Sequence, residues 1–459
     1  MLQSLTFALA TCATAIPFAP QEPEAERLAT RLGPALETRW VEALDGIEPE
    51  YRPGLEFLIE HMPASDRAGL DVELVVENVG YAYRAWQGAP WHAQVSEEIF
   101  LNEILPYASI NERRDRWRKD FHERFAPLVA EAKTPSEAAA ILNNEVFPQV
   151  GVIYSTERPK ADQSPYESIE AGMASCTGLS VLLVDACRSV GVPARFVGTP
   201  LWADGSGNHS WVEVWDEGWH FTGAAEPTGD RLNEAWFTER ASLALPEDRE
   251  RAIYAVSFRR TPLTLPMVWK PDADEVYAVN VTRRYLKEQE HSPGTARIQF
   301  RVRDAEGKRL TLPIVIRDRE GAVLQEANTR GASYDANDHL TYRFPIDQFL
   351  EVEIALDDRA QTLHLRVPEE GALVDFAMGA EMAAKVLSPT DLLWQKHVER
   401  LRLERAAERN AKTIVVDGHR LRYDYKVFGE APEGGHSLYI SMHGGGGAPA
   451  EVNDQQRKD

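Results

Sequence analysis

Residues 172–237 decide how the chain is organised: GMASCTGLSVLLVDACRSVGVPARFVGTPLWADGSGNHSWVEVWDEGWHFTGAAEPTGDRLNEAWF. The apolar run of residues 178–190 has the length of a buried helix, and Gly191-Val192-Pro193 ends it. Residues 209–215 then alternate like a strand, with His209, Trp211 and Glu213 on one side. We therefore predict a helix followed by a strand, with the rest of the chain supporting this unit.

Cys176 stands at the predicted start of that helix. A thiol there meets free backbone N–H groups and the positive end of the helix dipole, which stabilise a thiolate. The same N–H groups can hold a developing oxyanion. Cys187 lies in the apolar body of the helix, and we assign it to core packing. On one helix the two cysteines are too far apart for a disulfide.

A thiolate nucleophile needs a histidine within hydrogen-bond reach. His209 follows the flexible turn of residues 204–208 and opens the predicted strand. It is therefore the candidate base, and the alternative is a surface histidine at a strand edge. His220, on the next strand, is a weaker candidate that we assign to a structural role.

These segments resemble the transglutaminase-like superfamily. The resemblance rests on Cys176-Thr-Gly-Leu-Ser at a helix start, Gly191-Val-Pro-Ala-Arg after it, and His209-Ser-Trp-Val-Glu-Val, and it covers roughly residues 143–237. It implies an α+β core of papain-like kind in which Cys176 is the nucleophile and His209 the general base and acid. The implied chemistry is acyl transfer from an amide or ester through a thioester.

The acid of the site departs from that pattern. The family usually has an Asp, often followed by Pro, a few residues after the Trp of the next strand. Here Glu226-Pro227 resembles this pair, but it lies later and carries a Glu. We expect Glu226 to hold the His209 tautomer and stabilise the imidazolium, with Asp230 as the alternative. If neither carboxylate reaches His209, the domain is expected to be slow or inactive.

The regions on either side of the core have different periodicities. We predict a helical region over 21–140, the core over 141–270 and a β-sandwich of immunoglobulin-like kind over 271–378. A helix is expected to start at Thr134-Pro135-Ser136-Glu137. Another is expected over 110–132, with its basic cluster Arg113 to Lys119 facing solvent. We interpret the sandwich as a spacer or packing module; the alternative is carbohydrate or partner binding.

The last segments resemble a second family. Residues 379–411 are predicted to form a linker helix. Residues 412–459 end in His443-Gly-Gly-Gly-Gly, which resembles the oxyanion-hole loop of α/β-hydrolase esterases and polyester depolymerases. No Gly-x-Ser-x-Gly follows, so we interpret this segment as the truncated start of such a domain, unable to supply a serine triad.

Composition excludes several classes of function. The formal net charge of −22 over 459 residues argues against nucleic acid or anionic lipid as partners. No run is long and apolar enough to span a membrane. Motifs for nucleotides, metals and organic cofactors are absent, so we expect none of them. Residues 1–20 have the pattern of an export signal, with Cys12 in a near-lipoprotein context, which predicts a periplasmic or extracellular protein.

Together these features predict a thiol-dependent peptidase, amidase or acyltransferase that acts on a peptide or protein. Hydrolysis is favoured over crosslinking, and the oligomeric state is left open. One alternative is a non-catalytic binding or scaffold protein with a degenerate core. Another is the fragment of a bifunctional enzyme whose esterase domain is cut short.

Overall fold

The computed structural model describes residues 38–286, 294–356, 359–378, 382–416 and 419–423. The chain divides into two compact units, residues 1–388 and 389–459, and each is described by itself. The predicted export signal with Cys12 and the glycine run after His443 lie outside the described residues. Among the helices within those ranges, none has both the length and the apolar character needed to cross a bilayer.

The part of the chain before the sheet is mostly helical. Side chains cap two of its helices: Thr134 accepts the N–H of Glu137 at 3.2 Å, as predicted, and Asp71 accepts that of Glu73 at 3.0 Å. The helices are α2 (Thr38–Gly46), α3 (Arg52–His61), α4 (Ala64–Gly69), α5 (Val72–Gly88), η1 (His92–Gln94), α6 (Glu97–Ile99), η2 (Phe100–Ile104), α7 (Arg118–Phe125), α8 (Pro135–Val150) and α9 (Pro165–Ala171).

The prediction of one long helix over 110–132 was wrong, although Arg113, Arg116 and Lys119 of its basic cluster do face solvent. Helix α7 spans only Arg118–Phe125, and the residues before it form no helix. Arg118 is buried and donates to the backbone oxygens of Ile104 at 2.7 Å and Pro106 at 2.8 Å. Buried carbonyls without a helical partner need such a donor, and this need overrides the amphipathic pattern.

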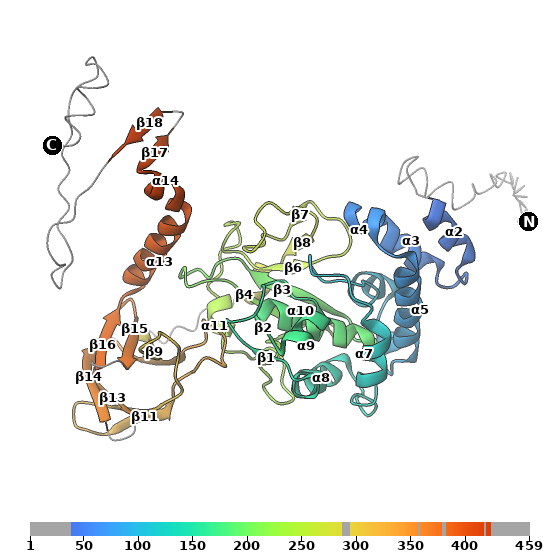
Figure 1. Cartoon of the computed structure of the whole chain (residues 1–459). Helices are drawn as coiled ribbons and strands as arrows, with labels where there is room; N and C mark the ends of the chain where they lie inside the picture. Colours follow the sequence, from blue (N-terminus) through green and yellow to red (C-terminus); the bar gives the residue numbers. More distant parts are fainter. Residues whose placement is uncertain (1–37, 287–293, 357–358, 379–381, 417–418, 424–459) are drawn as a thin grey trace, which may run out of the picture. The chain divides into compact units, whose positions relative to one another are not determined.

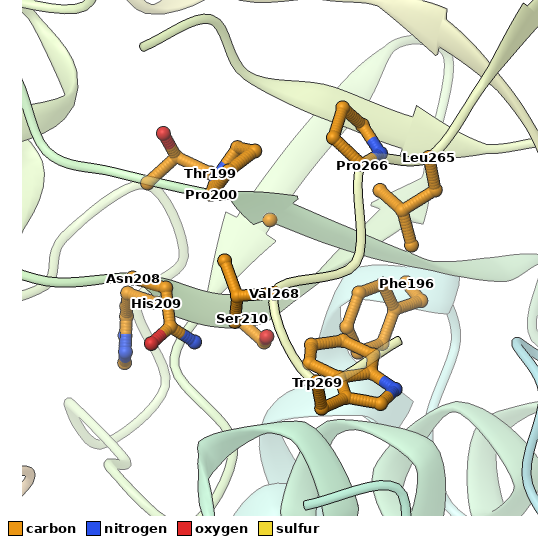
Figure 2. A pocket seen from close by; sticks show the side chains of 11 residues that line it. Phe196, Thr199, Pro200, Asn208, His209, Ser210, Leu265, Pro266, Val268 and Trp269 are labelled. Carbon is orange, nitrogen blue, oxygen red and sulfur yellow. The ribbon is translucent and has the colours of Figure 1, made fainter. Parts of the chain in front are cut away.

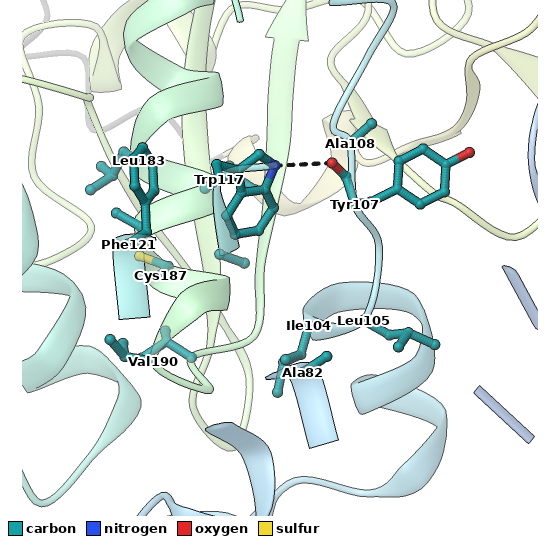
Figure 3. Close-up of a cluster of buried hydrophobic side chains, with 14 of the residues drawn as sticks. Ala82, Ile104, Leu105, Tyr107, Ala108, Trp117, Phe121, Leu183, Cys187 and Val190 are labelled. Atoms are coloured by element: carbon teal, nitrogen blue, oxygen red, sulfur yellow. Dashed lines mark hydrogen bonds between the residues drawn. The ribbon is translucent and has the colours of Figure 1, made fainter. Parts of the chain in front are cut away.

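Helix α10 (Cys176–Ser189) is the centre of this half of the molecule. Every residue from Thr177 to Ser189 is buried, and the helix contacts α7, α8 and α9 as well as two strands of the sheet (Figure 1). Figure 3 shows part of the surrounding core, in which Cys187 lies beside Phe121 and the indole N–H of Trp117 donates to the carbonyl of Tyr107 at 3.0 Å. The assignment of Cys187 to core packing is confirmed, since its side chain is fully buried.

The sheet beside α10 has six strands in the order β5-β4-β3-β6-β8-β7, and all neighbours are antiparallel. Strand β4 is held in register by a buried ion pair. Glu213 accepts from Arg195 at 2.6 and 2.8 Å and from the hydroxyl of Tyr285 at 2.7 Å. The strands are β3 (Ala194–Thr199), β4 (His209–Trp215), β5 (Trp219–Thr222), β6 (Tyr254–Val256), β7 (Leu263–Thr264) and β8 (Tyr277–Asn280), with the short helices α11 (Thr238–Ala241) and α12 (Thr282–Tyr285).

Residues 295–387 form two four-stranded sheets that share one apolar core, here called the sheet pair. One has the order β11-β10-β13-β14 and the other β12-β9-β15-β16. The mixed α+β class is thus confirmed, and the immunoglobulin-like kind of the sheet pair stays a prediction. The strands are β9 (Thr295–Asp304), β10 (Pro313–Arg317), β11 (Val323–Asn328), β12 (Leu340–Pro345), β13 (Phe349–Leu356), β14 (Arg359–Arg366), β15 (Ala372–Met378) and β16 (Met382–Leu387).

The second unit contains two helices and a hairpin within its described part. Helix α13 (Pro389–Glu404) begins later than the linker helix predicted over 379–411, because residues 382–387 pair with β15 as a strand. Helix α14 (Ala406–Ala411) follows, and β17 (Thr413–Val416) pairs with β18 (His419–Arg422). The α/β-hydrolase interpretation of 412–459 stays a prediction.

Candidate active site

Cys176 is the first residue of α10, and a short parallel ladder leads the chain to it. In this ladder β1 (Ile153–Tyr154) pairs with β2 (Met173–Ala174). Ser175, the N-cap residue, makes no side-chain capping bond; its hydroxyl donates to the carbonyl of Ala161 at 3.1 Å instead. The first-turn N–H groups of α10 are therefore not capped by Ser175 and are suited to holding an oxyanion beside Cys176. Cys176 is partly exposed.

His209 is the first residue of β4, opposite Thr199 of β3. Its side chain is only 1% exposed. Aromatic rings pack around the imidazole, with ring-centre separations of 4.8 Å to Trp236, 4.9 Å to Phe237 and 5.9 Å to Trp211. This packing fixes the plane of the ring, which a general base needs in order to meet a nucleophile repeatedly in one geometry. The alternative of a surface histidine was wrong.

The structure brings a third residue to this pair that the sequence analysis missed. The sulfur of Cys176, one ring nitrogen of His209 and one carboxylate oxygen of Asp335 all lie within 4.8 Å of one another. Oδ2 of Asp335 is 3.5 Å from Nδ1 of His209, too long for a hydrogen bond and short enough for an ion pair. Asp335 belongs to the β11–β12 loop (residues 329–339) of the sheet pair.

Charge within this cluster favours a protonated imidazole. Burial alone lowers the pKa of His209, but the Asp335 carboxylate and the Cys176 sulfur together raise that pKa well above its usual range. Burial works against ionisation of Asp335, yet the His209 ring and the N–H groups of Asn337 hold the pKa of Asp335 below its usual range. While Asp335 lies beside the ring, it therefore favours the protonated form of His209.

Glu226, the predicted orienting acid, is linked to His209 through the side chain of Trp236. Its Oε2 accepts a hydrogen bond from the indole N–H of Trp236 at 2.9 Å, and Trp236 packs on the imidazole. Burial raises the pKa of Glu226 to about 7; the positive His209 opposes this shift and the negative Asp335 adds to it. No hydrogen bond between Glu226 and His209 is present among the described residues.

The side chain of Glu226 folds back toward the end of β5. A Cβ atom at Gly223 would lie 2.1 Å from Oε2 of Glu226, so only glycine allows this approach. Asn143 holds the turn: its side chain donates to the carbonyl of Gly223 at 2.8 Å and accepts the N–H of Ala225 at 2.9 Å. Glu226 comes later in the sequence than the acid of the transglutaminase-like superfamily. Because the turn folds back, however, its carboxylate lies beside Gly223, the first residue after β5.

The remaining sequence candidates lie away from the reacting atoms. Asp230 is exposed in the turn after Glu226 and makes no described contact with His209. His220 has both ring nitrogens engaged, one with the carbonyl of Asp216 at 3.1 Å and one with the amide of Asn233 at 2.9 Å. Burial raises the pKa of Cys187 to about 12, which makes this thiol a poor nucleophile.

A small pocket borders His209 on the side of the sheet shown in Figure 2. It is shallow and open to solvent, with a volume of only about 10 Å³, and Val268 at its edge is half exposed. Figure 2 shows Trp269 and Leu265 across the pocket from His209. Its lining residues are mostly apolar: Phe196, Gly198, Thr199, Pro200, Asn208, His209, Ser210, Leu265, Pro266, Val268 and Trp269.

The cluster of Cys176, His209 and Asp335 is also a donor set that can hold a metal ion. Thiolate, imidazole and carboxylate together suit a tetrahedral ion such as Zn²⁺. A buried imidazole with neither nitrogen in a hydrogen bond fits such a role as well as it fits a catalytic one. Thiol chemistry at this site should therefore be measured with a chelator present.

A thiol at a helix start and a histidine on the adjoining sheet define the general class of a thiol–imidazole site. Within the chain, residues 123–223 match the transglutaminase-like superfamily. The match includes Cys176 and His209 and ends before Glu226 and Asp335. It agrees with the resemblance found in the sequence, and it indicates thiol-dependent hydrolysis or acyl transfer in general terms.

Among solved structures, one similar chain is a candidate cysteine protease from Cytophaga hutchinsonii. It is 14% identical to this chain, with a TM-score of 0.21, and the likeness covers 24% of this chain and 37% of the other. The chain thus spans well under half the length of that protein. No curated protein matches the chain.

Proposed function

We propose that the protein is a thiol enzyme that hydrolyses or transfers acyl groups of peptide-like amides, with Cys176 as nucleophile and His209 as base and acid. The observation that carries the proposal is the approach of the Cys176 sulfur to a buried His209 ring at the start of α10. A thiol there has a proton acceptor on one side and backbone N–H donors on the other.

The reaction proceeds in two balanced steps. His209 takes the thiol proton, the sulfur attacks the carbonyl carbon, and a C–S bond forms while the C–N bond breaks; the imidazolium gives its proton to the leaving amine. Water, or an amine in transfer, then attacks the thioester. His209 takes a proton from that second nucleophile and returns one to the sulfur as the C–S bond breaks.

Glu226 is the orienting acid in this proposal. Its carboxylate lies at the end of β5, next to β4 with its histidine, and is bonded to the Trp236 indole that packs on the ring. As a carboxylate, Glu226 stabilises the positive charge that His209 acquires when it takes the thiol proton.

The test is the Cys176→Ala variant of the full chain, assayed in the presence of EDTA on a panel of peptide amides, glycopeptides and p-nitrophenyl acetate. Loss of the nucleophile should lower turnover by about 10³-fold or more, because covalent catalysis disappears. Cys187→Ala serves as the matched thiol control and should retain turnover.

A third variant, His443→Ala, distinguishes the Cys176 site from an esterase site in the C-terminal segment. If turnover survives Cys176→Ala and falls with His443→Ala, the working site belongs to the C-terminal segment, and the proposal for Cys176 is refuted. Equal turnover by wild type and both cysteine variants would likewise exclude a thiol mechanism.

A further inference from the structure

We infer that the β11–β12 loop is a built-in cap on the thiol site, in which Asp335 fills the space in front of Cys176 that a substrate carbonyl must occupy. The loop would have to withdraw before Cys176 can be acylated. This inference concerns regulation of the same site and rests on the proposed function of Cys176 and His209.

The position of Asp335 relative to the imidazole is the first argument. In a catalytic triad, the thiol and the carboxylate bind opposite nitrogens of the imidazole ring. The ring and two hydrogen bonds of about 3 Å each then separate the sulfur from the carboxylate oxygen. Here the Asp335 oxygen and the Cys176 sulfur are within 4.8 Å of each other. Asp335 is therefore on the thiol's side of His209, where substrate enters, and not behind the ring.

The charge of Asp335 is the second argument. Its buried carboxylate stabilises the imidazolium but repels a thiolate at the same short range. A catalytic acid should favour the ion pair of thiolate and imidazolium as a whole. A carboxylate beside the sulfur instead competes with the thiolate for the positive ring, as an anion seated in the site would do.

The third argument is that the loop is docked by specific contacts on both sides of the site. The N–H of Ala336 donates to the hydroxyl of Tyr154 at 2.8 Å, in the ladder that leads to Cys176. The side chain of Asn337 donates to the carbonyl of Asn208, next to His209, at 3.1 Å. Gly207 allows this approach, since a Cβ there would be 3.0 Å from Oδ1 of Asn337.

The loop keeps its shape through its own bonds, so it can move as a unit. Asn337 donates its backbone N–H to Oδ1 of Asp335 at 2.9 Å, and Arg309 of the same sheet pair donates to the carbonyls of Asp335 at 2.8 Å and Asp338 at 2.9 Å. Two neutral hydrogen bonds and the Asp335 ion pair hold it to the core. Withdrawal of the loop from the core breaks these contacts and loosens the bonds to Arg309, and it leaves both sheets intact.

The experiment measures the rate at which iodoacetamide alkylates Cys176 in the full chain with EDTA, followed by peptide mass spectrometry so that Cys12 and Cys187 are scored separately. Since the rate scales with the fraction of open sites, Asp335→Ala should raise it by about tenfold. The matched control is Glu320→Ala, an exposed carboxylate in another turn of the sheet pair, which should alkylate like wild type. A Cys176→Ser variant confirms the labelled position.

Two variants that leave Asp335 in place test the docking contacts. Tyr154→Phe removes the acceptor for Ala336, and Asn337→Ala removes the donor to Asn208; each should raise the alkylation rate by about two- to fivefold, as the loss of one neutral hydrogen bond implies. Circular dichroism and thermal unfolding verify that each variant is folded.

The outcomes separate this inference from the proposed function. Faster alkylation in Asp335→Ala without turnover of any substrate supports the cap and refutes the enzyme. Slower alkylation together with lost turnover makes Asp335 part of the catalytic machinery and overturns the cap. An unchanged alkylation rate in all three loop variants also overturns it.

Discussion

The loop after β5 and the β11–β12 loop each deliver a carboxylate to His209, and they do so in opposite ways. Glu226 comes from the strand next to β4 and is held by Asn143 and Trp236 within the same core. Asp335 comes from the sheet pair, about 130 residues further along the chain than His209, and reaches the side of the ring that faces the thiol. The comparison suggests that an acid built into the core serves the chemistry, whereas one brought by a separate layer controls access to it.

The strongest way to break this comparison is to neutralise each carboxylate in turn. Glu226→Gln should lower kcat/KM for p-nitrophenyl acetate by about 10³-fold, because the imidazole loses the charge that supports it. Asp335→Asn should keep turnover at or above the wild-type level. Steady-state kinetics of both variants decide the matter, and a reversed pattern would exchange the two roles.

The pH dependence of stability should have opposite signs for the two acids. The pKa of Glu226 is raised to about 7 in the folded protein. As the pH rises from 4.5 to 7, the unfolded chain therefore loses this proton while the folded chain still holds it. The free energy of unfolding should fall by about 2 kcal/mol over this range. The pKa of Asp335 is lowered, so its contribution is present at neutral pH and is lost only as the pH falls below its usual value.

Urea unfolding across this pH range tests the difference. Glu226→Gln should remove the decline between pH 4.5 and 7, and Asp335→Asn should leave that decline in place while reducing the loss at lower pH. His209, whose pKa is raised, contributes stability that disappears only as the pH rises through its folded value. If Glu226→Gln retains the full decline, the carboxyl of Glu226 is not the group responsible.

The smallest expected effect concerns an ion pair between the sheet pair and the core, close to the β11–β12 loop. Arg297 of β9 forms an ion pair of 3.1 Å with Asp204, in the turn that leads to His209. Such partly exposed pairs contribute well under 1 kcal/mol, so Arg297→Ala should raise the alkylation rate of Cys176 by about twofold. Arg366→Ala, which breaks an ion pair within the sheet pair, is the control and should have no effect. A large effect of the control would mean that general loosening is being measured.

Much of the site's construction could be predicted because its signals are local. Cys176 at a helix start, His209 at a strand start and Thr134 as an N-cap are each set by neighbours within a few residues. The strand predicted over residues 209–215 coincides with β4 for the same reason: alternation and the preceding turn mark it in the sequence.

What could not be predicted depends on distant parts of the chain. Strand β15 pairs in parallel with β9 and is buried on both faces, so it shows no alternation. Asp335 lies in a polar loop that looks like an ordinary turn, and only the docking of the sheet pair brings it to His209. The acidic run Asp335-Ala336-Asn337-Asp338 is the one feature that could have drawn attention to it.

The placement of the β11–β12 loop also has a consequence for how the protein is made. Ribosomes add about 5–20 residues per second, and domains generally fold in the order of their synthesis. The helix with Cys176 and the strand with His209 therefore emerge several seconds before Asp335, and β12, β15 and β16, which complete the sheet that follows the loop, emerge later still. On the cap proposed above, the thiol of the newly folded core is uncovered during that interval, so oxidation or stray acylation is a greater hazard for the nascent chain than for the finished one.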